Sequence, residues 1–398
     1  MLTVEQALET ILSRVPRMGT ERVDVLGALG RVLAEPVVSR REIPPWPNSS
    51  MDGYAVRAED TRRGVALAVV GRVEAGGLPA RGVGRGEAIR IFTGAPLPPG
   101  ADAVVPQEEV EASGDHIALR APAERAAYVR QRGEDVRAGA RVLEPGTLLT
   151  AAEIGLLATL GHGQVPVHRR PRVAILSTGN ELADLGTEPG PGQIPNTNTY
   201  TLMAQVLEAG GDPINLGVAR DRLDAIEDRV RAARDADVLV SSAGVSVGEL
   251  DLVREALTRA GAELHLWQVS MRPGKPITFG SLASRPVWGL PGNPVSAMVT
   301  FELFVRPALL KMGGRRRHTR PRVRARALEA VPNPGSRRGY LRVQLEATVD
   351  GLGARLTGEQ GSAILRSMVA ADGLAVVPPD TVVPIGAELE IIQLRDLP

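Results

Sequence analysis

One stretch decides the fold, residues 237–262, which reads DVLVSSAGVSVGELDLVREALTRAGA. It begins with the short apolar run VLV, which is typical of a strand buried on both faces. A glycine-containing turn follows over residues 241–248, and apolar residues then recur at helical spacing up to Gly261, which is placed as a helix C-cap. A strand, a glycine turn and a helix in this order present backbone N–H groups to an anion.

The same turn contains GVSVG at residues 244–248, which also matches the G-x-S-x-G pattern around a serine nucleophile. A hydrolase of that type needs an acid and then a histidine later in the chain. The later histidines are His265, inside a predicted strand, and His318, inside an arginine-rich run. We therefore favour an anion cradle, and keep a serine hydrolase using Ser246 as an alternative. The cradle hypothesis assigns substrate contacts to Ser242, Gly244, Ser246 and Gly248.

The composition excludes several classes of protein. With 43% hydrophobic and 23% charged residues, the 398-residue chain has the make-up of packed globular domains. Its formal net charge of +1 gives no electrostatic reason to bind nucleic acid or a membrane surface, and the absence of cysteine excludes thiolate chemistry. Because no apolar run approaches about 20 residues and residues 1–15 are amphipathic with acidic side chains, we expect no membrane span, no signal peptide and a cytoplasmic protein.

The pattern along the chain predicts a multidomain α/β and β protein. Helical patterns over residues 1–42 and 144–170 flank short strand-like runs over 43–143, which predicts a helical connector domain interrupted by an inserted β-rich domain with a proline loop. Strands and helices alternate over 171–318, as in a largely parallel, doubly wound sheet. The final segment, 319–398, again reads as a β domain. The arginine-rich run RRRHTRPRVRAR before and across this boundary predicts a solvated linker, with a polyanion site as the alternative.

Polar loops recur where strands of the predicted α/β sheet end. They read STGNEL, SSAGVSVGELD, SMRPGKP and LPGNPVS. Ligands bind beyond the carboxyl ends of the strands in such sheets, and glycines let backbone amides approach an anion closely. We therefore expect one anion site to be assembled from these four loops.

The charged and capping residues of these loops suit a phosphate bound with a divalent metal. Arg272 and Lys275 supply positive charge, and Lys275 stands out because only two of the 47 basic residues are lysines. Glu181 and Asp251 supply carboxylates that can hold a metal against phosphate oxygens. We also expect Asn293 to cap a helix starting at Pro294, so that this helix end and Ser296 face the phosphate.

Six segments in order carry a resemblance over almost the whole chain. They are PPWPNSSMDGYAV, IFTGAPLPPGADAVVPQEE, ILSTGNEL, SAGVSVGELD, RPGKP and GLPGNPVSA. Together they resemble the molybdopterin molybdenumtransferase family, which includes the E domain of gephyrin. The resemblance implies insertion of molybdenum into molybdopterin, in which adenylyl-molybdopterin is cleaved with Mg²⁺ and molybdate and AMP is released. It also implies a homodimer whose active site lies between the α/β domain of one subunit and the proline-loop β domain of the other, and makes the adenylyltransferase of the same pathway a candidate partner.

The same resemblance implies roles for individual residues. Catalytic roles would fall to Asp52, Thr93, Asp135, Glu181 and Asp251, with Glu181 and Asp251 near the metal. Substrate-binding roles would fall to Arg272, Lys275, Pro291, Asn293, Pro294, Ser296, Arg342 and Ser367. A non-catalytic molybdopterin-binding scaffold remains an alternative from another class, and a preference for tungstate over molybdate is not separable by sequence.

One departure from the family pattern lies in the central turn. Family members usually have two glycines before its VS, and here the first is Ala243. If that position requires a positive φ, alanine costs roughly 1 kcal/mol. None of the departures removes Asp52, Glu181, Asp251 or Lys275.

Overall fold

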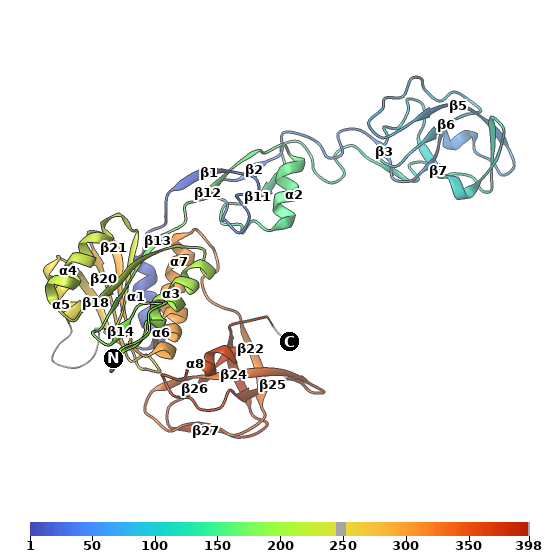
Figure 1. Ribbon diagram of the computed structural model, residues 1–398. Helices are drawn as coiled ribbons and strands as arrows, with labels where there is room; N and C mark the ends of the chain where they lie inside the picture. The colour runs from blue at the N-terminus through green and yellow to red at the C-terminus, as the bar shows by residue number, and fades with distance from the viewer. Residues whose placement is uncertain (244–251, 397–398) are drawn as a thin grey trace. The chain divides into compact units, whose positions relative to one another are not determined.

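The computed structural model describes residues 1–243 and 252–396 (Figure 1). The chain folds into two compact units. The first contains the α/β domain and the C-terminal β domain, and the second contains the inserted β domain. Their bounds are Met1–Ala34, Gly146–Ala151 and Gln164–Pro398 for the first, and Glu35–Pro145 and Ala152–Gly163 for the second.

The α/β domain is built on a six-stranded sheet in the order β16-β13-β17-β21-β20-β18. The first four strands run parallel, as the alternation predicts, and β20 and β18 pair antiparallel with their neighbours. Only Ala283 and Ser284 connect β20 to β21, both at positive φ, and so short a connection can only reverse the chain. The strands are β13 (Arg172–Thr178), β16 (Asp212–Ala219), β17 (Val238–Ser242), β18 (Glu263–Gln268), β20 (Pro276–Leu282) and β21 (Arg285–Leu290).

Helices cover both faces of this sheet, because side chains alternate along each strand (Figure 1). Val173 and Ile175 of β13 pack in one apolar cluster with α1 (Val4–Arg14), α3 (Thr197–Glu208), α6 (Pro294–Thr300) and α7 (Arg306–Met312). Ala174 and Leu176 pack in a second cluster with α4 (Leu223–Ala232) and α5 (Leu252–Arg259). The expected single helix after β21 is interrupted by a π-helical turn, Phe301–Val305, just before Pro307, which cannot donate a helical hydrogen bond.

The helical prediction for residues 1–42 is correct only for α1, which a Thr3–Gln6 capping box begins. The next apolar stretch is wrong as a helix. It forms β1 (Thr20–Asp24), paired with β12 (Gln164–His168), and then turns in which Gly30 has a φ of 73°. Later in the chain, β2 (Val37–Val38) pairs with β11 (Arg141–Leu143), and α2 (Ala151–Thr159) is helical as expected.

The inserted β domain has its own sheet, in the order β7-β4-β6-β5-β9-β8. Its apolar side chains form two clusters around Val56 and Ile91, so this domain has a core of its own. Its strands are β4 (Gly53–Val56), β5 (Ala66–Val73), β6 (Glu87–Ile91), β7 (Ala103–Pro106), β8 (Val110–Ser113) and β9 (His116–Leu119), beside the pair β3 (Asn48–Ser49) and β10 (Val129–Arg130).

The C-terminal domain is a closed barrel, because β26 pairs with both β28 and β24. Its strands are β22 (Arg322–Ala327), β24 (Arg338–Thr348), β25 (Gly351–Leu356), β26 (Gly373–Val377) and β28 (Glu388–Gln393), with α8 (Leu365–Val369) and the pair β23 (Val331–Asn333) and β27 (Thr381–Val383) beside them. The short strand β19 (Met271–Arg272) of the α/β region pairs with β24, which joins the barrel to the RPGKP loop. None of the helices in the described ranges has the length and apolar character that a bilayer crossing requires.

Candidate active site

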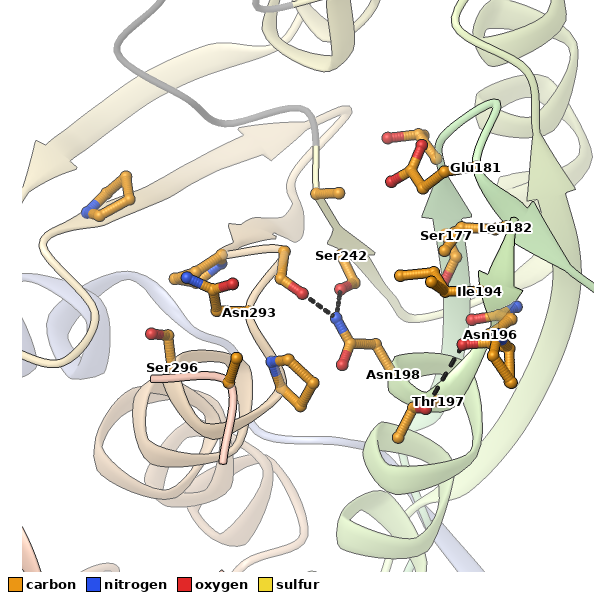
Figure 2. Close-up of a pocket in the computed structure, with 18 residues that line it drawn as sticks. Ser177, Glu181, Leu182, Ile194, Asn196, Thr197, Asn198, Ser242, Asn293 and Ser296 are labelled. Carbon is orange, nitrogen blue, oxygen red and sulfur yellow. Dashed lines mark hydrogen bonds between the residues drawn. The ribbon is translucent and has the colours of Figure 1, made fainter. Parts of the chain in front are cut away.

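A cleft of about 650 Å³ opens at the carboxyl ends of β13, β17 and β21 (Figure 2). This is where a doubly wound sheet binds its ligands. In Figure 2, Glu181, Leu182 and Ser177 form one wall, Asn293 and Ser296 the other, and Asn198 and Ser242 lie between them. The cleft also draws its lining from Thr178, Ile194, Pro195, Asn196, Thr197, Ala243, Pro276, Pro291, Gly292, Pro294 and Ala363.

Asn198, at the start of α3, connects two of the segments that line the cleft. Its Nδ2 donates to Ser242 Oγ and to the Gly292 carbonyl, both at 2.7 Å (Figure 2). Because a carbonyl only accepts, the orientation of the amide is fixed. Asn198 thus joins the end of β17 to the loop after β21. The sequence pattern gives Asn198 no role, since only the fold brings these two loops together.

Glu181 projects from a loop that a second loop holds in place. Asn180 and Asp221 exchange hydrogen bonds between the backbone N–H of each and the side-chain oxygen of the other, both at 3.2 Å, and Arg220 donates to the Asn180 carbonyl. The Glu181 carboxylate itself is exposed in the cleft and makes no hydrogen bond or ion pair within the described part of the chain. Sequence reasoning missed Arg220 and Asp221, although their place directly after β16, next to β13 in the sheet, is a signal that could have found them.

Ala243 adopts the conformation that the departure from the family pattern called into question. Its φ is 72°, and its N–H donates to the Leu290 carbonyl. Its side chain faces Gly292, where an added Cβ would lie 3.3 Å from the Ala243 Cβ. The chain therefore carries a strained alanine in the lining of its cleft.

We expect Ala243→Gly to raise the free energy of unfolding by about 1 kcal/mol, because glycine adopts this φ without strain. The matched control is Ala204→Gly, an exposed position inside α3, where the same change is expected to cost about 1 kcal/mol. Calorimetric unfolding of the two variants measures both effects. Equal destabilisation by the two substitutions would contradict the strain.

The loop after β21 departs from the predicted capping. Asn293 does occupy the N-cap position with Pro294 first in the helix, but its side chain caps nothing. It donates instead to Ser362 Oγ at 2.9 Å, and the Ser362 carbonyl accepts from Val295 N–H. A backbone carbonyl of the barrel domain thus accepts from the Val295 N–H, which a capping side chain would otherwise have bonded. Ser296 and Pro291 line the cleft as expected.

Arg272, Lys275 and Arg342 form no ion pair with a carboxylate in the described residues. Arg272 and Lys275 lie on the loop that ends at Pro276, a cleft residue. This loop needs Gly274, which has a φ of 102° and no room for a Cβ against Thr300. Pairing of β19 with β24 brings the loop to the barrel strand that carries Arg342.

Arg342 is fully buried and only partly satisfied. Its Nε donates to Ser367 Oγ at 3.0 Å and its Nη2 to the Gly361 carbonyl at 3.0 Å, while Nη1 has no hydrogen-bond partner in the part of the chain that the structure describes. Burial, the larger cause, and the charge of Arg272 together lower the pKa of Arg342 to about 10. A buried guanidinium that remains charged at neutral pH beside a second cation is a strong attractor for an anion.

Asp52 and Thr93, both in the inserted β domain, contact each other as a pair. Asp52 Oδ1 accepts from the Thr93 N–H and from its hydroxyl, both at 2.8 Å. These two hydrogen bonds, the backbone one first, hold the pKa of Asp52 below its ordinary value. Asp135 is exposed, and no interaction within the described ranges joins it to either residue.

The proposed contacts at Gly244, Ser246, Gly248 and Asp251 lie outside the described residues. Within those residues His265 contacts the Ser281 hydroxyl and His318 contacts the Arg315 carbonyl. The described ranges also hold no group of three or more His, Asp or Glu side chains that could bind a metal by themselves.

Comparison with known proteins decides the family. Residues 2–161 match the model of the MoeA N-terminal region (domains I and II), 174–311 that of a probable molybdopterin binding domain, and 324–394 that of the MoeA C-terminal region (domain IV). This chain belongs to the molybdopterin molybdenumtransferase (MoeA) family of enzymes.

Its relatives match nearly end to end. The molybdopterin molybdenumtransferase of Nostoc is 38% identical over 99% of this chain and 94% of its own, and that of Haemophilus influenzae is 38% identical over 81% and 80%. Two crystal structures of a Pyrococcus horikoshii molybdopterin biosynthesis MoeA protein superpose with TM-scores of 0.84 and 0.86, at 35% and 32% identity, over 99% or more of each chain. These matches confirm the resemblance and the multidomain fold that the sequence predicted.

Proposed function

We propose that this MoeA-family protein inserts molybdenum into molybdopterin, by cleaving adenylyl-molybdopterin in the presence of Mg²⁺ and molybdate and releasing AMP. The observation that carries the proposal is the buried, unpaired Nη1 of Arg342 beside Arg272. A site with several cations that no carboxylate of the described residues neutralises suits a doubly charged oxyanion such as molybdate, or a phosphate. Relatives bearing the name molybdopterin molybdenumtransferase support the choice of substrate.

The residues in and beside the cleft would have distinct roles in binding the substrates. The terminal phosphate and the pterin would occupy the cleft between Glu181 and Ser296, while Arg272, Lys275 and Arg342 hold the oxyanion beside it. Cations and fixed amide dipoles stabilise the charge that develops as a phosphoanhydride breaks.

Glu181 fits a role in holding Mg²⁺. Its carboxylate is exposed in the cleft and unpartnered among the described residues. Mg²⁺ commonly keeps several waters and is bound by one or two carboxylates together with substrate phosphates. Bound there, Mg²⁺ would supply charge neutralisation at phosphate oxygens. Asp251 would be the second carboxylate of this proposal.

Asp52 and Thr93 would join the reaction from the second subunit of a homodimer, with Asp135 near them. A size measurement on the purified protein tests this part separately, because a strict monomer would contradict it. The adenylyltransferase of the same pathway would supply the adenylylated substrate.

A direct assay tests the reaction. Purified protein is incubated with adenylyl-molybdopterin, Mg²⁺ and molybdate, and AMP release is followed. We expect Glu181→Gln to reduce AMP release by about a hundredfold or more, because a metal carboxylate is lost. The matched control is Glu188→Gln, seven residues further along the chain and exposed outside the cleft, which is expected to react as wild type. Binding of the substrate without AMP release would favour the scaffold alternative, and labelling of Ser246 by a fluorophosphonate would favour the hydrolase.

A further inference from the structure

The Asp52–Gly53 segment is held from several sides in the inserted β domain. The Asp52 side chain accepts two hydrogen bonds from Thr93, and its carbonyl accepts from Gln107 N–H at 3.1 Å. Gly53 pairs with Ile91 and Pro106 in the sheet and has no room for a side chain, since an added Cβ would lie 2.0 Å from the Val105 carbonyl oxygen. Both bonds from Thr93 reach the same oxygen, so Oδ2 keeps no partner within the described residues.

Arg90 contacts both Gly53 and Gln107. Its Nη1 donates to the Gly53 carbonyl at 3.4 Å, and its Nη2 donates to the side-chain oxygen of Gln107, the residue whose backbone holds Asp52. Its guanidinium lies 4.9 Å from the ring centre of Tyr54 and 5.1 Å from that of Phe92, so stacking fixes the plane of the fork. In the described part of the chain Arg90 has no carboxylate ion pair, whereas Arg72, on the neighbouring strand, pairs with Glu74.

We propose that Arg90 is a positioning residue for the reaction, whose guanidinium fork fixes the Asp52–Gly53 segment so that Asp52 Oδ2 is presented to the substrate. This rests on the proposed function for the assignment of Asp52 to the reaction. The fork itself is read from contacts within one compact unit. Lysine cannot replace it, because an ammonium does not supply two parallel donors in one plane.

The contacts of Arg90 predict a larger effect on the titration of Asp52 than its charge alone would. Asp52 owes its lowered pKa first to the backbone bond from Thr93, then to the Thr93 hydroxyl, and least to the charge of Arg90. The other charged groups around the segment are Arg72 on β5, Glu74 directly after β5, and Glu108 beside Gln107. If Arg90 acts only through its charge, its loss changes the titration of Asp52 less than loss of the Thr93 hydroxyl. If it positions the segment, its loss also weakens the bonds from Thr93.

The titration of Asp52 in the full-length protein tests this without substrate. The carboxyl carbons of aspartate are labelled with ¹³C, and the Asp52 signal is assigned from the spectrum of Asp52→Asn. In Arg90→Gln and Arg90→Lys we expect the titration midpoint to rise toward the ordinary aspartate value at least as far as in Thr93→Val. Gln107→Leu, which removes one attachment of the fork, is expected to raise it part of the way. The matched control is Arg72→Gln, which changes the other guanidinium stacked on Phe92, 4.7 Å from its ring centre, and is expected to leave Asp52 titrating as in wild type.

The activity of the same variants gives a second result. We expect kcat/KM for AMP release at pH 7 to fall about tenfold or more in Arg90→Lys, and the acidic limb of its pH profile to move to higher pH. An Arg90→Lys protein whose Asp52 titrates as in wild type would overturn the inference. If wild-type protein releases no AMP while Arg90→Lys shifts the titration, the proposed function fails and the positioning role stands.

Discussion

Replacing Arg342 with methionine is expected to leave the protein as stable as wild type or more stable, while molybdate-dependent AMP release falls by about a hundredfold or more. Arg342 is fully buried, its Nη1 has no hydrogen-bond partner among the described residues, and the charge of a second cation, Arg272, acts on it. An apolar side chain of similar length removes the cost of that buried charge. Stability and AMP release are expected to change in opposite directions because Arg342 serves to bind an anion and does not stabilise the fold.

The control for this prediction is Arg366→Met, in the same short helix as Ser367 but exposed. We expect it to change neither stability nor activity. Thermal unfolding with and without molybdate separates the two roles, since only a protein that binds the ion is stabilised by it. An Arg342→Met protein that loses several kcal/mol of stability, or that keeps molybdate-induced stabilisation, would contradict the anion site.

The pKa of Arg342 adds a pH dependence with a definite sign. Its value of about 10 in the folded protein lies below the ordinary arginine pKa, so the unfolded chain binds the proton more tightly. The destabilisation is therefore complete below pH 10 and is relieved as the pH rises from 10 toward the pKa of the unfolded chain. Oxyanion affinity moves the other way and is expected to decline above pH 10, where the guanidinium loses its charge. Titration of molybdate binding in wild type and Arg342→Met checks this.

Replacing Glu302 with glutamine is expected to lower the free energy of unfolding by about 3 kcal/mol. Glu302, in the π-helical turn, is buried, and its Oε1 lies 2.6 Å from Arg320 Nε and 3.4 Å from Arg306 Nε. Arg320 also donates to the Leu394 carbonyl at the end of the barrel domain. Loss of the carboxylate leaves two largely buried cations without compensation, and it releases the segment that joins the α/β domain to the barrel.

The matched control is Glu390→Gln, which breaks the exposed ion pair with Arg322, two residues along the chain from Arg320. An exposed pair of this kind contributes about 0.5 kcal/mol. Calorimetric unfolding of both variants measures the difference. Similar small losses in the free energy of unfolding from both variants would show that the ion pairs of Glu302 with Arg306 and Arg320 do not hold the α/β domain and the barrel together.

The arginine-rich run, residues 315–326, differs in part from the solvated linker that the sequence predicted. The prediction of a solvated linker is wrong for Arg320, which pairs with Glu302, and for Arg315, whose pKa is lowered by burial. A charge run alone does not show which arginines meet a buried carboxylate 18 residues earlier in the chain. The wrong helix after α1 has a similar cause, because pairing with β12, more than 130 residues later, overrides a weak local pattern.

The sequence by itself determined the family and the fold class, and it predicted the loops of the candidate site. Strand-turn-helix patterns and glycine positions are local signals, so they survive without tertiary information. The stretch at 237–262 predicted a buried strand entering a glycine turn, and β17 ends there at the cleft. It also identified Ala243 as the place where strain would arise.

Only the tertiary structure decided which of these residues meet. Arg342 and Arg272 come together because β19 pairs with β24, and Asn198 reaches Ser242 and Gly292 because three strands end at one edge. Asp221 supports the Glu181 loop, and Arg90 holds the Asp52 segment, through contacts between residues 37 to 41 positions apart. Such contacts leave no mark on local periodicity, because they depend on strand register and on burial, which the whole fold sets.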